Sequence, residues 1–371
     1  MNTTKLNSLP RQRQTSMRET TPRKTRLHQK NPVSGFTRRM VMKSRRSTPQ
    51  NGHVRPLPEP ATVSPWLNPT QLERPAFVLN FPFSFSTQCP NNPWMEDLPP
   101  DRRQPDFKRA TVQFLEMYRT IAAEALVYLL PTPRGVELQD LMYTANLGIV
   151  LDHLPDRNTV VVSNFASPPR RGETPVGIRF FQELGYDVHV PETKFEGEAE
   201  LKHLHDNVYI GGYGIRSERE TYDWMERTFD MRIVKVRETE QYLYHLDCSV
   251  FPITKENTLI CTKLFDRKEV AQIEKVTNVL DVSVDECFSG ICNSVRLGQL
   301  VLNSSHIHDL KAGTKDYKDE VQKNRKLEDL AANLALDVSY FNLSEYHKSG
   351  ALLSCMVMHL NRHSYKIALT A

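Results

Sequence analysis

The amino-acid sequence predicts an α/β fold, and three observations support this prediction. A short β-rich segment that begins at a polar residue recurs at Asn158, Asn207, Asn257 and Gln299, with spacings of 49, 50 and 42 residues. Each copy is followed by a helical pattern and then by another β-rich segment, the order that is typical of α/β proteins. The composition, with 39% apolar and 25% charged residues, is that of an ordinary globular protein.

The four repeats contain the same elements in the same order. The first strands are Asn158-Thr-Val-Val-Val-Ser, Asn207-Val-Tyr-Ile-Gly, Asn257-Thr-Leu-Ile-Cys and Gln299-Leu-Val-Leu-Asn. The helical stretches cover about 172–185, 218–229, 266–276 and 316–333, and the strands after them are Asp187-Val-His-Val, Arg232-Ile-Val-Lys-Val, Val279-Leu-Asp-Val-Ser and Leu336-Asp-Val-Ser. With a further strand before each polar turn, every unit reads strand, strand, helix, strand.

The segment 77–150 supplies a fifth, less regular unit. Phe77-Val-Leu-Asn-Phe-Pro-Phe83 predicts a strand, and residues 106–130 predict a helix that ends at Pro131. The expected helix face holds Val112, Leu115, Ala122, Leu126 and Leu129. One such unit cannot cover its own apolar sheet face, so successive copies must pack side by side. About five ββαβ modules favour closure into a pseudosymmetric α/β ring over an open array.

The charge is divided unevenly along the chain. Residues 1–50 hold 13 Lys and Arg and one acid, a net charge of +12, which leaves −8 for the remainder of a protein whose formal total is +4. We expect residues 1–70 to be a disordered basic tail with a Pro-rich linker, and residues 71–371 to form a single catalytic domain. The tail is compatible with organelle targeting, with weak nucleic-acid contacts, or with an unselected leader ahead of a start at Met40 or Met42.

No spanning helix, secretion signal or metal motif is evident. No uncharged apolar run approaches the roughly 20 residues of a membrane span, which predicts a cytoplasmic protein without a membrane partner. The six cysteines are too few for a disulfide scaffold in so long a chain, and they form no C-x-x-C pair. Cys287 and Cys292 are interpreted as buried core thiols. We therefore expect no structural metal and no cofactor, and the sequence is compatible with a homodimer.

Polar residues also occupy the segment just before the polar residue that begins each repeat. They are Asn146, Glu196, His245 with Asp247, Asn293 with Ser294, and Cys355, which lies nine residues before an expected final hairpin strand at Ser364. Equivalent strand ends of a ring converge on its axis, so these side chains should border one pocket. Taken singly, His245 and Cys355 would more often be ordinary core residues. A thiol, an imidazole, two carboxylates and an amide together are the groups that thiol-based nucleophilic catalysis requires.

The same positions carry a resemblance to a known family. The relevant motifs are Asn92-Pro-Trp-Met95, Tyr143-Thr-Ala-Asn146, Phe195-Glu-Gly-Glu198, Gly212-Tyr-Gly-Ile-Arg-Ser217, Tyr244-His-Leu-Asp247 and Ser349-Gly-Ala-Leu-Leu-Ser-Cys355. In this order and over residues 75–371, they resemble the guanidino-group-modifying enzymes of the amidinotransferase and dimethylarginine dimethylaminohydrolase superfamily. The resemblance implies the pentein fold, a five-bladed pseudosymmetric α/β propeller, in agreement with the repeat count.

The resemblance also implies catalytic roles. Cys355 would attack the guanidinium carbon as a thiolate and form a covalent thiouronium intermediate. His245 would protonate the departing amine or ammonia and then take a proton from the attacking water. Glu196 would bind guanidinium nitrogens and orient the imidazole.

Further residues are implied substrate ligands. Asp247 would be the second guanidinium ligand, on the same strand face as His245. Asn146 stands where many arginine-processing members carry aspartate. Arg216 would hold the substrate α-carboxylate, with a structural salt bridge as the alternative. Asn293 is equally compatible with substrate contact and with a strand-terminal turn.

Two departures from the family pattern place the substrate in question. Glu196-Gly-Glu-Ala-Glu200 stands where Glu-Gly-x-Gly-Asp is usual, and Gly350-Ala-Leu-Leu-Ser has fewer glycines than usual. The leading hypothesis is a metal-free hydrolase of linear amidines, acting on a C–N bond of arginine or methylated arginine. The alternatives are an amidinotransferase, an arginine dihydrolase that gives ornithine, and an inactive pentein that serves as a binding module.

Overall fold

The computed structural model describes residues 68–366, and these residues contain five three-stranded sheets. The first sheet holds β1 (Ala76–Leu79), β2 (Leu126–Leu129) and β15 (Met358–His359), and the second β3 (Gly148–Val150), β4 (Thr159–Val162) and β5 (Asp187–His189). The third holds β6 (Leu201–His205), β7 (Val208–Tyr213) and β8 (Arg232–Arg237), and the fourth β9 (Val250–Pro252), β10 (Asn257–Ile260) and β11 (Asn278–Asp281). The fifth holds β12 (Val295–Leu297), β13 (Leu300–Ser304) and β14 (Asp337–Phe341).

All five sheets follow one pairing pattern. The middle strand is antiparallel to one neighbour and parallel to the other. A parallel pair needs a crossover connection, and the helices that provide the five crossovers are α3 (Phe107–Glu124), α4 (Glu173–Glu183), α5 (Arg219–Phe229), α6 (Arg267–Ile273) and α8 (Lys315–Asn333). The predicted order of strand, strand, helix, strand is thus confirmed for the four regular repeats, whose helices lie within three residues of the expected ranges.

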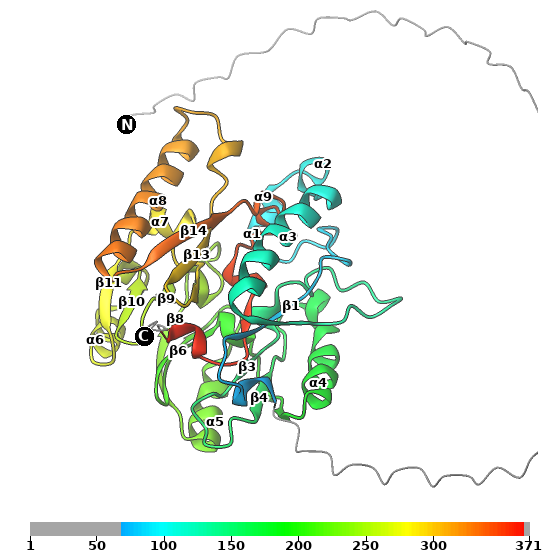
Figure 1. The fold of residues 1–371 in the computed structure, drawn as a ribbon, viewed down its shortest axis with the longest axis vertical. Coiled ribbons are helices and arrows are strands. Elements are labelled where there is room, and N and C mark those ends of the chain that lie inside the picture. The colour runs from blue at the N-terminus through cyan, green and yellow to red at the C-terminus, as the bar shows by residue number, and fades with distance from the viewer. Residues whose placement is uncertain (1–67, 367–371) are drawn as a thin grey trace, which may run out of the picture. The chain divides into compact units, whose positions relative to one another are not determined.

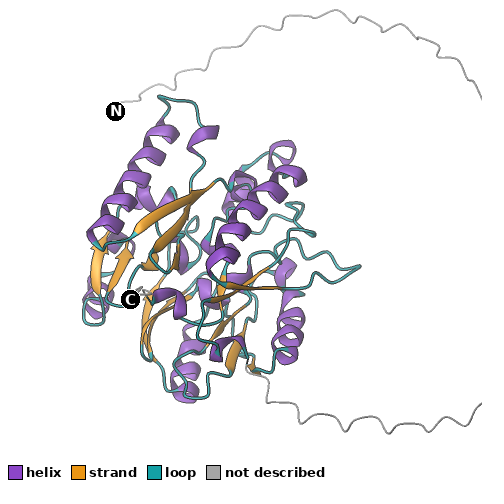
Figure 2. Ribbon diagram, in the orientation of Figure 1, coloured by secondary structure: helices purple, strands orange, loops and turns teal. Residues whose placement is uncertain are grey.

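The crossover helices lie outside the strands. Figure 2 shows the long helices at the periphery with the sheets between them. The shorter helices α1 (Pro93–Asp97), α2 (Pro100–Arg103), α7 (Val284–Phe288) and α9 (Ser344–His347) lie in connecting segments. Within residues 68–366, no helix has the length and apolar character that crossing a membrane requires.

The prediction for residues 106–130 was wrong in its extent and in its buried face. The helix α3 begins after the cap Asp106 and ends at Glu124, because Ala125 adopts an extended conformation and the following residues form β2. The buried face holds Ala110, Gln113, Phe114, Met117 and Ile121, whereas Val112 and Leu129 are exposed. The apolar pattern was ambiguous because Leu126-Val-Tyr-Leu129 pairs with β1 as a strand.

The first sheet joins the two ends of the described chain. Its β15 follows Cys355 and pairs antiparallel with β1, so that Phe77 faces His359. Figure 1 shows β1 in blue and the C-terminal part of the described chain in red. The expected hairpin strand at Ser364 is absent from the described residues, where that position lies in a single 3₁₀ turn. The Ser364 carbonyl accepts a hydrogen bond from the Gly298 amide instead.

Five apolar clusters fill the spaces between consecutive sheets. The first and second sheets share one cluster, the second and third another, and so on along the chain, and a fifth cluster joins the fifth sheet to the first. Representative buried pairs in these clusters are Val78 with Val160, Val161 with Tyr209, Ile210 with Ile260, Leu259 with Val301, and Leu302 with Phe77. Every sheet therefore buries apolar surface against two others.

Two further sequence predictions concern the ends of the fold and its thiols. The predicted tail and most of the linker, residues 1–67, lie outside the described residues. The described chain begins at Asn68, which is buried together with Thr70. Cys287 and Cys292 are buried in the cluster between the fourth and fifth sheets, as expected for core thiols.

Candidate active site

The candidate site is built from short turns that precede the antiparallel strand of four sheets. These 3₁₀ turns are Thr144–Asn146 before β3, Gly197–Ala199 before β6, Leu246–Cys248 before β9 and Ser354–Met356 before β15. The sequence placed the polar residues at strand ends, and the structure places them in or at the start of these turns. His245 and Asp247 accordingly lie at a turn rather than on one strand face, which corrects that detail of the prediction.

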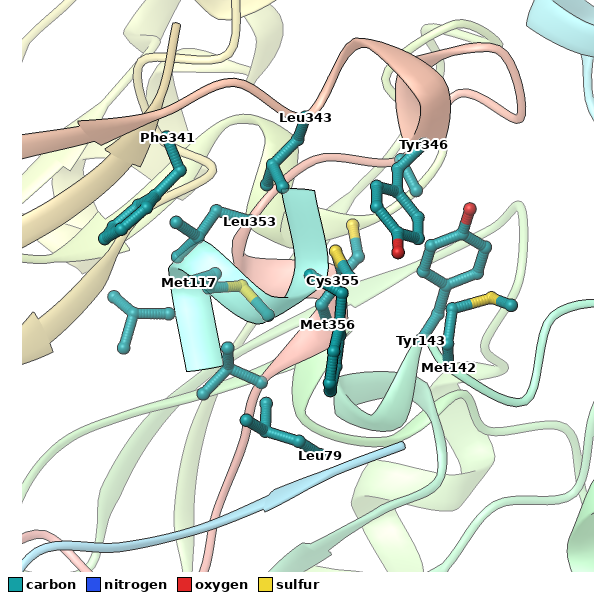
Figure 3. Close-up of a cluster of buried hydrophobic side chains, with 14 of the residues drawn as sticks. Leu79, Met117, Met142, Tyr143, Phe341, Leu343, Tyr346, Leu353, Cys355 and Met356 are labelled. Carbon is teal, nitrogen blue, oxygen red and sulfur yellow. The ribbon is translucent and has the colours of Figure 1, made fainter. Parts of the chain in front are cut away.

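The thiol of Cys355 is buried and held by two side chains. Its Sγ atom lies 3.4 Å from Asn293 Nδ2, which donates to it, and 3.5 Å from Asp247 Oδ2. Figure 3 shows Cys355 inside the apolar cluster that also contains Tyr143 and Tyr346. Burial and the negative charge of Asp247 raise the pKa of the Cys355 thiol to about 12. The thiol is therefore protonated at neutral pH unless a cation approaches it.

The imidazole of His245 is held by Glu196. His245 Nε2 lies 2.7 Å from Glu196 Oε2, and the imidazole is buried. Burial lowers the pKa of His245, an effect that the Glu196 carboxylate opposes. The Asn146 side-chain amide contacts the imidazole, because its Nδ2 atom lies 3.4 Å from each ring nitrogen of His245.

Glu196 is a fully buried carboxylate whose oxygens are both engaged. Oε2 meets His245, and Oε1 accepts from the Ala166 amide at 3.1 Å and lies 3.7 Å from the Arg216 guanidinium. Burial alone would raise the pKa of Glu196, but the hydrogen bond to His245 and the charges of Arg216 and Arg170 lower it to about 2. The carboxylate is thus ionised and is placed to orient the imidazole.

Asp247 links the thiol to the turn that carries it. Its Oδ2 atom accepts a 2.6 Å hydrogen bond from the Ser354 hydroxyl and lies near Cys355 Sγ. Asn293 supports the same turn, because its Oδ1 accepts from the Ser354 amide at 2.7 Å. Asn293 thus contacts the turn that holds Cys355 and does not border the cavity.

Arg216 is more constrained than the sequence suggested. Its guanidinium donates to the Asn91 carbonyl at 2.6 Å, approaches Glu196 and lies 4.8 Å from the centre of the Tyr244 ring. The salt-bridge alternative therefore has a partner in the structure. The side chain still borders the cavity described next, so it remains placed to meet a substrate.

A narrow cavity of about 20 Å³ lies over the thiol. Its walls are Asn91, Asn92, Asp140, Tyr143, Asn146, Arg170, Arg216, Tyr244, His245, Ser349, Ala351 and Cys355. The volume is about that of one water molecule. A larger ligand can enter only if part of this wall moves. Of the predicted site residues, Cys355, His245, Asn146 and Arg216 border the cavity, whereas Glu196, Asp247 and Asn293 stand behind them.

Sequence reasoning missed two charged groups in this wall. Arg170 donates two hydrogen bonds to Glu173, at 2.9 and 2.7 Å, and contacts the carbonyls of Asp140 and Tyr143. Asp140 accepts from Asn91 at 2.7 Å, and burial raises the pKa of its carboxyl group despite the nearby Arg170. Both residues lie outside the strand-end pattern, so the period of the repeats could not reveal them.

Within residues 68–366, no group of three or more His, Cys, Asp or Glu side chains is arranged to hold a metal ion. The side chains at the cavity offer a protonated thiol, an imidazole paired with an ionised carboxylate, and two guanidinium groups at the wall. A thiol and an imidazole at one cavity can form a covalent bond to a ligand and move protons to and from it.

Comparison with known proteins gives a consistent picture. No protein-family model matches the chain. The chain is similar to two curated proteins named as bifunctional arginine dihydrolase/ornithine cyclodeaminases: ArgZ of Synechocystis sp., 26% identical over 273 residues, and AgrE of Nostoc sp., 27% identical over 241 residues. The matches cover 72% and 63% of this chain but only 35% and 33% of those proteins. The chain thus spans about a third of the length of these relatives.

Solved structures agree in fold. The N-terminal domain of ArgZ, described as an arginine dihydrolase from the cyanobacterial ornithine-ammonia cycle and bound to product, superposes with a TM-score of 0.66 at 24% identity. That match covers 77% of this chain and 97% of the domain. A dimethylarginine dimethylaminohydrolase adduct matches with a TM-score of 0.55 at 16% identity, over 77% of this chain and 99% of the other.

Proposed function

Because this chain belongs to the pentein superfamily of guanidino-group-modifying enzymes, we propose that it hydrolyses the guanidino group of arginine or a close derivative through a covalent bond to Cys355. The observation that carries the proposal is the arrangement at the cavity. The thiol and the imidazole both border it, the thiol contacts Asp247, and the imidazole contacts Glu196.

The proposed fold is a five-bladed α/β propeller. Its support is the cyclic order of the apolar clusters, in which each sheet packs against the next and the fifth against the first. In such a ring the strand ends that carry Asn146, His245 and Cys355 face a common axis, which explains how residues from three sheets reach one cavity.

In the first step, a cationic guanidinium enters the cavity beside Cys355, in front of the Asp247 carboxylate that stands behind the thiol. The positive charge of the guanidinium favours the thiolate of Cys355, whose pKa is otherwise about 12, and the proton of the thiol passes to His245. The thiolate attacks the guanidinium carbon, and the C–N bond to one terminal nitrogen breaks. His245 gives the leaving nitrogen the proton that it needs to depart as ammonia, or as a methylamine from a methylated substrate. The product of this step is an S-alkyl thiouronium on Cys355.

In the second step, His245 acts as a base. It takes a proton from a water molecule, the oxygen attacks the thiouronium carbon, and the C–S bond breaks to regenerate Cys355. The net change is that one water is consumed and one ammonia is released, so that arginine becomes citrulline. Glu196 stays ionised throughout and orients the ring, because its low pKa keeps the proton on the imidazole.

A full dihydrolase reaction is the second candidate, and a specific observation favours it. A neutral amide, Asn146, contacts the imidazole where many arginine-processing relatives carry a carboxylate, and the curated relatives are named for arginine dihydrolysis. Adding a second water to the ureido carbon gives ornithine, carbon dioxide and a second ammonia. The proposed substrate class is the same, and only the number of hydrolytic steps differs.

The test is a product analysis. The protein is incubated separately with arginine, with dimethylarginine, and with arginine plus glycine, and products are identified by mass spectrometry. Citrulline indicates a single hydrolysis, ornithine with carbon dioxide a dihydrolase, and a guanidino product of glycine an amidinotransferase.

The controls separate the thiol from the rest of the protein. Cys355→Ser should abolish turnover with the fold retained, whereas Cys89→Ser, at an exposed thiol that does not border the cavity, should leave turnover unchanged. No turnover of any mixture, together with no labelling of Cys355 by a chloroacetamidine reagent, would refute the enzyme proposal and leave the binding-module alternative.

A further inference from the structure

Two buried carboxyl groups lie behind the candidate site and have no role in the chemistry above. Glu200 follows the turn that Glu196 begins, and Glu238 follows β8. Both flank Gly212 of β7: a side chain there would place its Cβ 2.8 Å from the Glu238 carboxyl carbon and 3.0 Å from Glu200 Oε2. Gly212 therefore provides the space in which the two carboxyl groups meet.

The two carboxyl groups lack the donors that buried carboxylates need. Of their four oxygens, Glu200 Oε1 and both Glu238 oxygens receive no hydrogen bond from any described group, although the two residues are 0% and 7% exposed. The remaining oxygen, Glu200 Oε2, accepts from the Leu246 amide at 3.2 Å. An ionised carboxylate can only accept hydrogen bonds, whereas a protonated one can also donate. A proton held between the two groups would therefore supply the missing donor.

The surroundings of the pair favour this proton. Burial raises the pKa of both groups. The charge of Glu238 and a hydrogen bond through a shared proton raise the pKa of Glu200 further, whereas the same hydrogen bond lowers the pKa of Glu238. Asp247 and Glu196 face Glu238 with negative charge and raise its pKa further, while Arg216 opposes them; the pKa of Glu238 is raised to about 8. Two other titratable groups lie nearby. The Tyr222 hydroxyl donates to the backbone carbonyls of Glu200 and Gly212, and the Cys248 thiol contacts Asp247.

We propose that Glu200 and Glu238 form a proton-sharing acid pair that holds the His245–Asp247 segment in its active position. The link is the hydrogen bond that the Leu246 amide donates to Glu200. Leu246 lies between His245, whose imidazole moves protons in the proposed mechanism, and Asp247, which contacts the thiol. When the pair loses its shared proton, two adjacent buried carboxylates repel each other. Glu200 then cannot keep both its place and its bond to Leu246. The two glutamates are positioning residues, since neither borders the cavity.

This role rests on the proposed function, so its test includes measurements that need no turnover. The variants are Glu238→Gln, Glu200→Gln and the control Glu220→Gln, at an exposed position in the first turn of α5. Glutamine at position 238 can donate to Glu200 without a titrating proton. Unfolding midpoints in urea are measured from pH 5 to pH 10 for each protein.

The sign follows from linkage. The folded protein keeps a proton that the unfolded chain releases near pH 4.5, so the wild type should lose stability progressively as pH rises from about 4.5 to about 8 and level off above it. The control should follow the wild type, and Glu238→Gln should show a smaller decline; part of the decline remains because burial also raises the pKa of Glu173, to about 7. An identical pH dependence in Glu238→Gln and the wild type would overturn the shared proton.

The positioning role is tested by the pH dependence of kcat and of Cys355 alkylation. Ionisation of Cys355 alone makes both rates rise with pH, so a fall in kcat above about pH 8 with unchanged KM needs another group. We expect that fall in the wild type and the control, and its displacement to higher pH in Glu238→Gln. A stability profile that changes while the kcat and alkylation profiles do not would refute positioning.

Two experimental results, absence of turnover and failure of a variant to fold, would require a different interpretation. If no guanidino compound is turned over, the proposed function fails, and the alkylation and unfolding profiles still decide whether the pair acts on the segment. If Glu238→Gln does not fold, Glu200→Gln and the infrared absorption of protonated carboxyl groups in the wild type replace it. Absence of a protonated carboxyl band at pH 7 that disappears by pH 9 overturns the proposal.

Discussion

Replacing Asp247 by asparagine should raise the reactivity of the Cys355 thiol in the free protein and lower the catalytic rate. Asp247 Oδ2 lies 3.5 Å from Cys355 Sγ, and its charge is one of the two main reasons for the thiol's high pKa. Asparagine has nearly the same shape and can still accept from Ser354, which donates to Asp247 at 2.6 Å. The substitution therefore removes a charge while the turn keeps its hydrogen bond.

The magnitude follows from the distance between the two groups. Two unit charges 3.5 Å apart interact by about 5 kcal/mol at an effective dielectric constant of about 20. That energy corresponds to about 3 pKa units. This is an upper limit, because burial is the larger cause of the raised pKa of Cys355 and remains in the variant, so the pKa should fall only part of the way from about 12 to the ordinary value. At pH 8 the thiolate fraction, and with it the alkylation rate of the free protein, should rise by up to about a thousandfold.

Turnover should fall in the same variant. The asparagine cannot balance the guanidinium charge, and losing a hydrogen bond to a charged group costs about 1.5–3 kcal/mol. This predicts a decrease of about 10- to 100-fold in kcat/KM. Iodoacetamide labelling, followed by peptide mapping at Cys355, measures the thiol, and product formation measures turnover. Asp101→Asn, at an exposed position, is the matched control.

The reasoning is refuted if Asp247→Asn leaves the labelling rate of Cys355 equal to that of the wild type or lowers it. Such a result would mean that the aspartate charge does not hold the thiol protonated. Cys355 would then need an activating group other than the substrate cation.

Three further substitutions test the imidazole and its supports. Glu196→Gln should destabilise the protein by about 3 kcal/mol at pH 7, from the shift of its pKa from 4.5 to about 2; because a lowered pKa stabilises only above the unfolded value, urea unfolding should show this difference shrinking as pH falls below about 4.5. Arg216→Lys should raise KM about tenfold with little change in kcat, since lysine lacks the planar fork that meets Asn91 and Glu196; a kcat loss alone in steady-state kinetics would contradict a binding role. Asn146→Asp should raise the pKa of His245 and so move the acid limb of the kcat profile to higher pH; an unmoved limb would mean that position 146 does not influence the ring.

The repeating part of the fold was predictable because its signals are local. Each regular module carries its own turn residues, β-rich segments and helical pattern within about fifty residues, so its elements could be identified without tertiary information. The same periodicity located Asn146, Glu196, His245 and Cys355, because equivalent turns occupy equivalent places. Segment 106–130 failed for the opposite reason: β2 depends on pairing with β1, and the apolar pattern alone could not separate strand from helix.

The rest of the site depends on contacts that sequence spacing does not encode. Asp140 and Arg170 reach the cavity from a loop and from a 3₁₀ turn before α4. Glu200 stood out only as a departure from a family motif. Its partner, Glu238, lies 38 residues away and carried no signal of its own. Such groups become visible when burial and missing hydrogen-bond donors are considered together, since a buried carboxyl group without a donor needs a physical explanation.

The charges around Cys355 connect activation with substrate selection. In the free protein, burial and the nearby aspartate keep the thiol protonated, so it should react slowly with adventitious electrophiles. In the proposed mechanism, a bound guanidinium would supply the positive charge that favours the thiolate, and Asp247 would balance the same charge. A neutral ligand of similar shape gains neither effect, because it leaves the thiol protonated and the aspartate unpaired. The acidic surroundings that make Cys355 a poor nucleophile alone are therefore what would restrict its reaction to cations.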